Sequence, residues 1–138
     1  MPEMKPELSK KNPYWISKHR YYQLVHYCLQ YNEWKDMRRR IGDISAVNLD
    51  GMPKSTGPSR GIENAGVRRA ELKHKMELIE HTAREADPAL AEWIVKGVTN
   101  DGIGYDYLRD VMGIPCGRRQ YHERRRKFFW LLSQKLGE

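Results

Sequence analysis

The chain has 138 residues and a formal net charge of +7, with 39% hydrophobic and 31% charged residues. This composition is typical of a globular protein, and no apolar run approaches the roughly 20 residues that a membrane-spanning helix needs. No apolar stretch follows the first residues, so we expect no secretory signal, no membrane partner and a cytoplasmic location. Cys28 and Cys116 lie far apart in the sequence, which fits a reducing compartment.

The positive charge is concentrated at the two ends of the sequence. Residues 1–42 carry nine Lys or Arg against four Asp or Glu, and residues 113–138 carry seven against two. Residues 43–112, in contrast, carry nine against twelve. Basic charge gathered in this way indicates a polyanionic partner, such as nucleic acid.

The first third of the chain predicts a flexible tail followed by a helical unit. Residues 1–13 are polar and contain three prolines, as expected for a tail. In residues 14–42 apolar side chains recur at spacings of three and four, with a break at Tyr31–Asn32 and a second short helix ending at Gly42. This second helix has a basic face, interpreted either as a solvated surface or as auxiliary phosphate contacts. Its residues are Lys35, Arg38, Arg39 and Arg40.

The middle of the chain predicts a linker and then one long helix. Residues 43–61 are rich in Gly, Pro and Ser, which is typical of a linker loop. Residues 62–85 keep a seven-residue apolar repeat, so this helix either packs on the first helix or forms a dimer seam. Asp87–Pro88 then predicts a helix start, with Asp as the N-cap and Pro at the first helical position.

Residues 88–136 follow the order of a helix-turn-helix unit. A helix ends before Gly102, and a short helix covers Tyr105 to Met112. A turn beginning Gly113-Ile114-Pro115 then leads into a long basic helix. Ile114 is expected to fill the gap between the last two helices. The turn is about two residues longer than is usual, and its glycines and proline make that length tolerable.

The last helix has an apolar stripe and a basic face. Tyr121, Phe128 and Leu132 are expected to pack on Leu108, Val111 and Trp93, while Arg119, His122 and Arg126 lie opposite at spacings of three and four. Arginine is the commonest reader of guanine, and glutamine reads adenine. The candidate DNA-binding residues are Arg118, Arg119, Gln120, His122, Arg124, Arg125, Arg126 and Lys127. The alternative interpretation is a solvated basic helix.

The chain resembles the RinA-type regulators of phage late genes, and more loosely the ArpU-like group and region 4 of sigma factors. The resemblance covers the length and the order of elements: an aromatic pair at the end of the first helix (residues 31–34), a polar loop, a long helix and a terminal helix-turn-helix. It is strongest from Tyr121 to Glu138, where a His-Glu-Arg run leads to apolar residues and then to Leu-Gly-Glu. It implies a phage-encoded activator that binds a promoter and assists host RNA polymerase. The implied DNA contacts are Arg118, Arg119, Gln120, His122 and Arg126.

The predicted fold class is therefore all-α: an N-terminal helical unit, the long helix, and a helix-turn-helix within residues 62–138. The predicted function is sequence-specific DNA binding in transcription activation, with double-stranded DNA and RNA polymerase as partners and a possible homodimer. The alternative is a DNA-packaging subunit resembling a small terminase, which would form a ring of many copies. We expect no enzyme, cofactor or metal site, because the five histidines are scattered and no phosphate-binding glycine loop is present. Cys116 either fills the turn or has a pKa lowered by nearby arginines.

Overall fold

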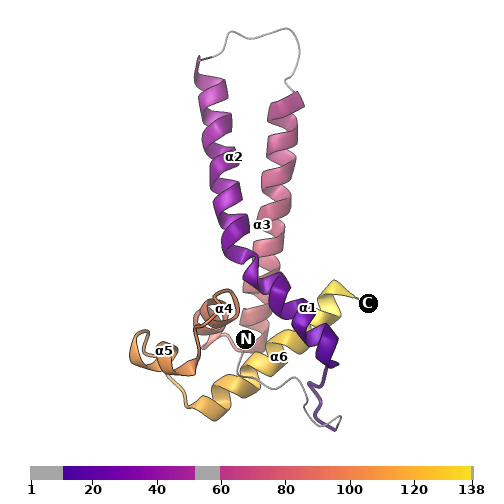
Figure 1. Cartoon of the computed structure of the whole chain (residues 1–138), viewed down its shortest axis with the longest axis vertical. Coiled ribbons are helices and arrows are strands. Elements are labelled where there is room, and N and C mark those ends of the chain that lie inside the picture. The colour runs from indigo at the N-terminus through magenta and orange to yellow at the C-terminus, as the bar shows by residue number, and fades with distance from the viewer. Residues whose placement is uncertain (1–10, 52–59, 138) are drawn as a thin grey trace.

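A computed structural model describes residues 11–51 and 60–137 of the chain, with side chains for 11–43 and 64–137. Within these residues there are six helices and no strands, which confirms the all-α prediction. They are α1 (Lys18–Leu29), α2 (Tyr31–Gly51), α3 (Arg60–Ala86), α4 (Ala91–Val98), α5 (Tyr105–Asp110) and α6 (Arg118–Leu136). Helices α2 and α3 form an antiparallel hairpin that projects from a body. In that body α1, α4, α5 and α6 gather around the end of α3 (Figure 1).

The expected break between the first two helices is confirmed to within a residue. Helix α1 ends at Leu29, and Gln30 separates it from α2. The main-chain N–H of Trp34 donates to the carbonyl of Gln30 at 2.9 Å, so the second helix begins immediately after the first. The predicted tail falls largely on residues 1–10, which lie outside the described residues.

The prediction that the second helix ends at Gly42 is wrong, because α2 continues to Gly51. The predicted linker of residues 43–61 is therefore helical at both ends, and its residues 52–59 lie outside the described part of the chain. Glycine lowers helix propensity by about 1 kcal/mol, but tertiary packing overrides such preferences. The guanidinium group of Arg69 lies over Gly42, where an added Cβ would be 3.2 Å from its Cζ atom. Gly42 thus marks a close approach within the hairpin, not the end of a helix.

The predicted long helix of residues 62–85 is confirmed by α3, but the start predicted at Asp87–Pro88 is wrong. Helix α4 begins at Ala91. The Asp87 carboxylate accepts a hydrogen bond from the Ala89 N–H at 2.9 Å, and its carbonyl accepts one from the Leu90 N–H at 3.1 Å. Asp87 therefore stabilises a tight turn before the helix; aspartate is common in such turns as well as at helix N-caps.

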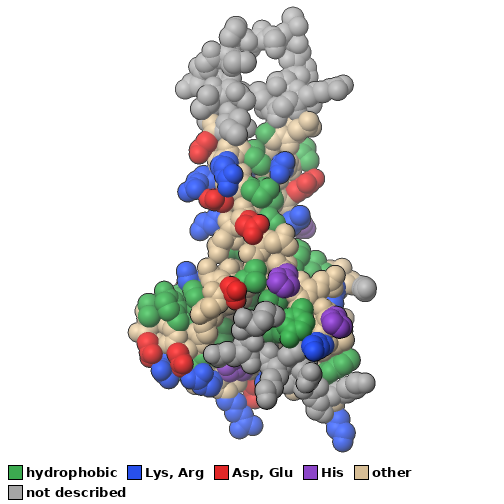
Figure 2. All heavy atoms as spheres, in the orientation of Figure 1, with side chains coloured by type: hydrophobic (Ala, Val, Ile, Leu, Met, Phe, Trp, Pro, Cys, Tyr) green, Lys and Arg blue, Asp and Glu red, His purple; other side chains and the backbone are tan. Residues whose placement is uncertain are grey.

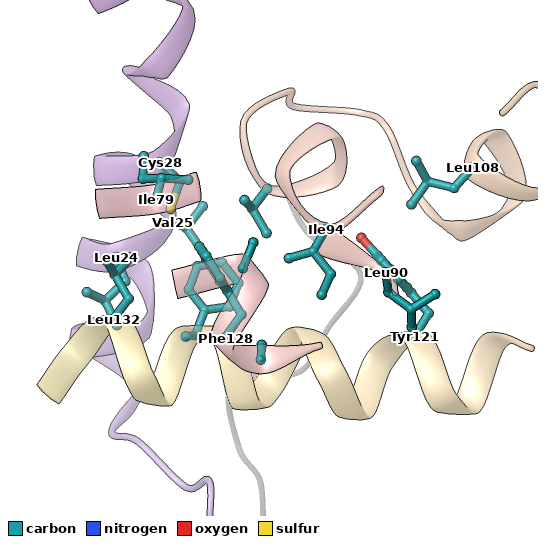
Figure 3. Close-up of a cluster of buried hydrophobic side chains, with 14 of the residues drawn as sticks. Leu24, Val25, Cys28, Ile79, Leu90, Ile94, Leu108, Tyr121, Phe128 and Leu132 are labelled. Atoms are coloured by element: carbon teal, nitrogen blue, oxygen red, sulfur yellow. The ribbon is translucent and has the colours of Figure 1, made fainter. Parts of the chain in front are cut away.

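The core lies where α6 crosses the other helices of the body (Figure 3). The predicted stripe of Tyr121, Phe128 and Leu132 is confirmed, because all three side chains are buried. Of their three predicted partners, Leu108 is buried, as predicted. Trp93 is half-buried, and its indole N–H donates to the Met112 carbonyl at 3.0 Å. The prediction for Val111 is wrong, because its side chain is 64% exposed. Other buried side chains of this core come from α1, α3, α4 and the N-cap residue of α4. They are Leu24, Val25, Ile79, Ala83, Leu90 and Ile94.

Arg20 of α1 holds the C-terminal end of α6. Its Nε donates to the Ser133 hydroxyl at 2.9 Å, and its Nη2 donates to the carbonyls of Ser133 at 3.0 Å and Gly137 at 2.6 Å. The last carbonyls of a helix lack partners within the helix and carry partial negative charge, so an arginine is a favourable cap. The contact therefore ties the first helix to the end of the last one.

Tyr121 holds α6 against α4 by packing on the main chain at Gly97. The Tyr121 hydroxyl lies directly on Gly97, where an added Cβ would overlap it and lie 3.4 Å from the ring carbon Cζ. Gly97 is buried near the C-terminal end of α4, one residue before its last. The glycine is needed here for close approach, since its main chain is helical.

We expect Gly97→Ala to lower the free energy of unfolding by about 1–3 kcal/mol, because an overpacked core must shift. Equilibrium unfolding in urea measures this change. Gly66→Ala is the matched control: Gly66 lies in α3 with no atom near an added Cβ, so alanine there is expected to stabilise the helix by about 0.5–1 kcal/mol. Adding Tyr121→Phe to Gly97→Ala removes the overlapping hydroxyl and is expected to restore part of the loss. Equal effects of the two glycine substitutions would contradict the assigned contact.

Candidate nucleic-acid interface

Helix α5, a connection and α6 follow one another in the order of a helix-turn-helix. Residues 111–117 form the connection, which is longer than the three or four residues that are common in such units. Gly113 has a φ of +65°, and the Ile114 N–H donates to the Leu108 carbonyl at 3.0 Å. Ile114 is buried between the helices, as predicted. The Tyr105 hydroxyl donates to the Cys116 carbonyl at 2.6 Å and holds the second half of the connection.

The first turn of α6 forms an exposed positive end. Gly117 is its N-cap, and no side chain caps the helix there. The first N–H groups of a helix lack partners within it, so this turn adds a partial positive charge to that of the arginines. The Arg119 side chain is 95% exposed, with its Nε 3.8 Å from the Glu123 carboxylate, and Gln120 is exposed beside it.

Arg118 is attached to α5. Its guanidinium group pairs with the Asp106 carboxylate and lies over the Tyr105 ring, 5.0 Å from the ring centre. The side chain remains half exposed. Figure 2 shows acidic and basic side chains side by side at this edge of the body, where α5 meets the start of α6. Arg118 therefore joins the two helices while its outer edge stays open to solvent.

Two of the predicted DNA-binding arginines are used inside the protein. Arg124 pairs with Asp87 at 3.0 Å, which ties α6 to the turn after α3. Arg125 is only 8% exposed; it donates to the Tyr21 hydroxyl at 3.1 Å and lies 4.9 Å from the centre of the Phe129 ring. Because Arg125 faces α1, we exclude it from the surface that can meet DNA. Burial raises the pKa of Tyr121, and the neighbouring Arg125 opposes that shift.

The predicted face of Arg119, His122 and Arg126 becomes less accessible along the helix. His122 and Arg126 are half-buried, as is Lys127. The His122 ring lies 5.3 Å from that of Tyr121 in an edge-on contact. The Nε of Arg126 is buried and has no hydrogen-bond partner in the described part of the chain. The exposed end of the face is therefore its N-terminal turn.

The predicted auxiliary phosphate contacts lie elsewhere, on the hairpin. Lys35 is exposed on α2, and Arg38 donates from Nε to the Arg69 carbonyl at 3.2 Å. Arg39 and Arg40 both pair with Asp36, at 2.6 and 3.3 Å. The hairpin points away from α6 (Figure 1), so these residues and the exposed turn of α6 form two separate surfaces.

Cys116 does not have the pKa of an activated thiol. Burial and then the charge of Asp87 raise its pKa, and the opposing effect of Arg124 is smaller. Among the described residues, no three His, Cys, Asp or Glu side chains gather where they could hold a metal ion. None of the described helices has the length and apolarity needed to cross a membrane.

Two acidic residues that shape this surface were not predicted from the sequence. Asp106 holds Arg118, and Asp87 holds Arg124. Both partners are distant in sequence, so no spacing within one helix indicates either pair. The one signal in the sequence for such pairs is the excess of arginine over acidic residues in α6, because some of those arginines would pair with carboxylates of other elements.

Comparison with family models, curated proteins and solved structures gives no match to this chain.

The structure separates the arginines of α6 into those that stabilise the protein and those that face solvent. We expect Arg124→Gln to lower the free energy of unfolding by about 1–2 kcal/mol, because Asp87 is largely buried and loses its partner. Arg119→Gln is expected to change it by less than about 0.5 kcal/mol, as for most exposed residues. Urea unfolding of both variants provides the measurement, and equal losses would contradict this division.

Proposed function

We propose that this protein is a sequence-specific DNA-binding regulator of transcription, in which the exposed turn of α6 enters the major groove. One observation carries the proposal: the second helix of the helix-turn-helix, α6, exposes an arginine and a glutamine in its first turn, Arg119 and Gln120. The N-terminal residues of such a helix are those that meet base edges. The resemblance to RinA-type regulators supports an activator of phage late genes that acts with host RNA polymerase.

The residues of α6 have different roles in this proposal. Arg119 and Gln120 read base edges, and His122 and Arg126 contact the groove one and two turns further along, respectively. Arg118 meets phosphate with its exposed edge while Asp106 fixes its position. Lys127 contributes charge, and Arg124 keeps α6 in place through Asp87. Arg125 supports the helix from inside.

The packaging alternative differs in assembly and in selectivity. A small-terminase-like subunit forms a ring and needs no single preferred sequence, whereas a regulator acts as a monomer or dimer on one site. Selection of bound fragments from random duplex DNA, together with the solution mass, separates the two. A sharp consensus with a monomer or dimer supports regulation. A ring-shaped oligomer that selects no consensus sequence would support the packaging function instead.

Arg119→Ala and Arg126→Ala are each expected to weaken binding to the selected duplex by about 1–3 kcal/mol, the value of a good base contact. Fluorescence anisotropy with labelled duplex measures the loss. Arg40→Ala is the control, since it removes an exposed arginine from the hairpin and is expected to leave affinity unchanged. The affinity of the unaltered protein is expected to fall steeply with salt, with a logarithmic slope of about −0.9 per neutralised phosphate. Unchanged affinity in both α6 variants would refute this use of the helix.

A further inference from the structure

A cationic groove runs between the two helices of the hairpin, separate from the proposed DNA surface. It has a volume of about 630 Å³. Its lining combines four cationic side chains, one carboxylate, one amide and one thioether. These are Lys35, Arg38, Arg39, Arg69, Asp36, Asn32 and Met76. Figure 2 shows basic side chains along both helices of the hairpin.

Two of the cations are held in place by the helices themselves. The Nε of Arg38 donates to the carbonyl of Arg69, and the Nε of Arg69 donates to the carbonyl of Arg38, each at 3.2 Å. Arg69 also lies over Gly42, so its guanidinium group has little room to move. These bonds leave the terminal nitrogens of both arginines as donors for an external acceptor. Preorganised guanidinium groups lose little entropy when they bind a carboxylate.

The acidic residue of the groove is already neutralised. Asp36 pairs with both Arg39 and Arg40, and these two arginine side chains remain 73% and 68% exposed. Lys35 and the Arg38–Arg69 pair therefore present positive charge without a matching carboxylate in the lining. Such an excess favours an anionic ligand, especially one that excludes water from the groove.

The size and place of the groove favour a polypeptide over a DNA duplex. Arg69 is in the first half of α3, while Asp87, which contacts α6, directly follows its end. At about 1.5 Å per residue, about 27 Å of helix separates Arg69 from Asp87. A duplex lying on α6 would not extend along the hairpin, which points away from α6 (Figure 1). Met76 adds an apolar floor, which suits a side chain better than a phosphate.

We propose that this groove binds an acidic, amphipathic segment of a protein partner, with carboxylates on Lys35, Arg38, Arg39 and Arg69 and an apolar side chain on Met76. This proposal goes beyond DNA binding and does not depend on it, because the groove shares no residue with the surface on α6. Both surfaces can therefore be occupied together.

The test uses the full chain and a labelled amphipathic peptide of about 15 residues, built from Glu and Leu, which spans about four helical turns. Its binding is measured by anisotropy at physiological salt, with and without unlabelled duplex DNA. A peptide with Gln in place of Glu is the ligand control. The groove variant is Lys35→Gln/Arg39→Gln, which leaves the Arg38–Arg69 bonds intact. The matched protein control is Arg40→Gln/Arg68→Gln, which removes the same charge from hairpin residues outside the groove lining.

We expect the acidic peptide to bind and the Gln peptide not to bind. The groove variant is expected to lose at least about tenfold in affinity, and the control variant less than about twofold. Equal losses in the two variants, or equal binding of the two peptides, would overturn the proposal. If duplex DNA displaces the peptide from the unaltered protein, and the groove variant no longer binds the peptide, the groove would be a nucleic-acid site instead. Peptide binding without any DNA binding would refute the proposed function alone.

Discussion

The contact between Tyr121 and Gly97 is the constraint on which the position of α6 depends. The phenol hydroxyl rests on the main chain of α4, and the ring lies 6.0 Å from that of Tyr105 on α5. One side chain therefore contacts both helices that precede α6. A residue with any side chain at position 97 would move α6 away, and the direction in which Arg119 leaves the body would change with it. Rigid packing makes such a shift costly.

The positive charge of α6 is divided between arginines that hold the helix in place and arginines that are exposed to solvent. Burying the Arg125 cation costs desolvation energy, which the Tyr21 hydroxyl and the Phe129 ring offset in part. Arg124 and Arg118 pair with carboxylates of neighbouring elements. The number of arginines in the sequence thus overstates the positive surface, and the exposed charge is concentrated at the first turn. A small basic edge on a well-held helix suits selective contact better than a diffuse basic surface does.

Periodicity predicted the helices and the apolar side of α6, because those follow from local spacing: Tyr121, Phe128 and Leu132 are buried as expected. It failed where partners distant in sequence decide the outcome. Gly42 was predicted to end a helix, but Arg69 packs on it from α3. Arg125 and Arg119 cannot be told apart by residue type, but spacing distinguishes them: Arg125 lies four residues after Tyr121 and three before Phe128, on the buried side of α6, where it meets α1. The base contacts, DNA partner and family resemblance stay predictions, since nothing observed tests them.

The long helix α3 connects the two cationic surfaces. Its first half lines the groove through Arg69, and its end is tied to α6 through Asp87 and Arg124. A helix is much more rigid than a flexible linker, so partners bound to the two proposed surfaces would be held at a fixed separation. A protein segment in the groove would then have a high effective concentration near DNA on α6, without any contact between the two binding sites. In this proposal the basic residues of α2 would support DNA binding by α6 without touching DNA themselves.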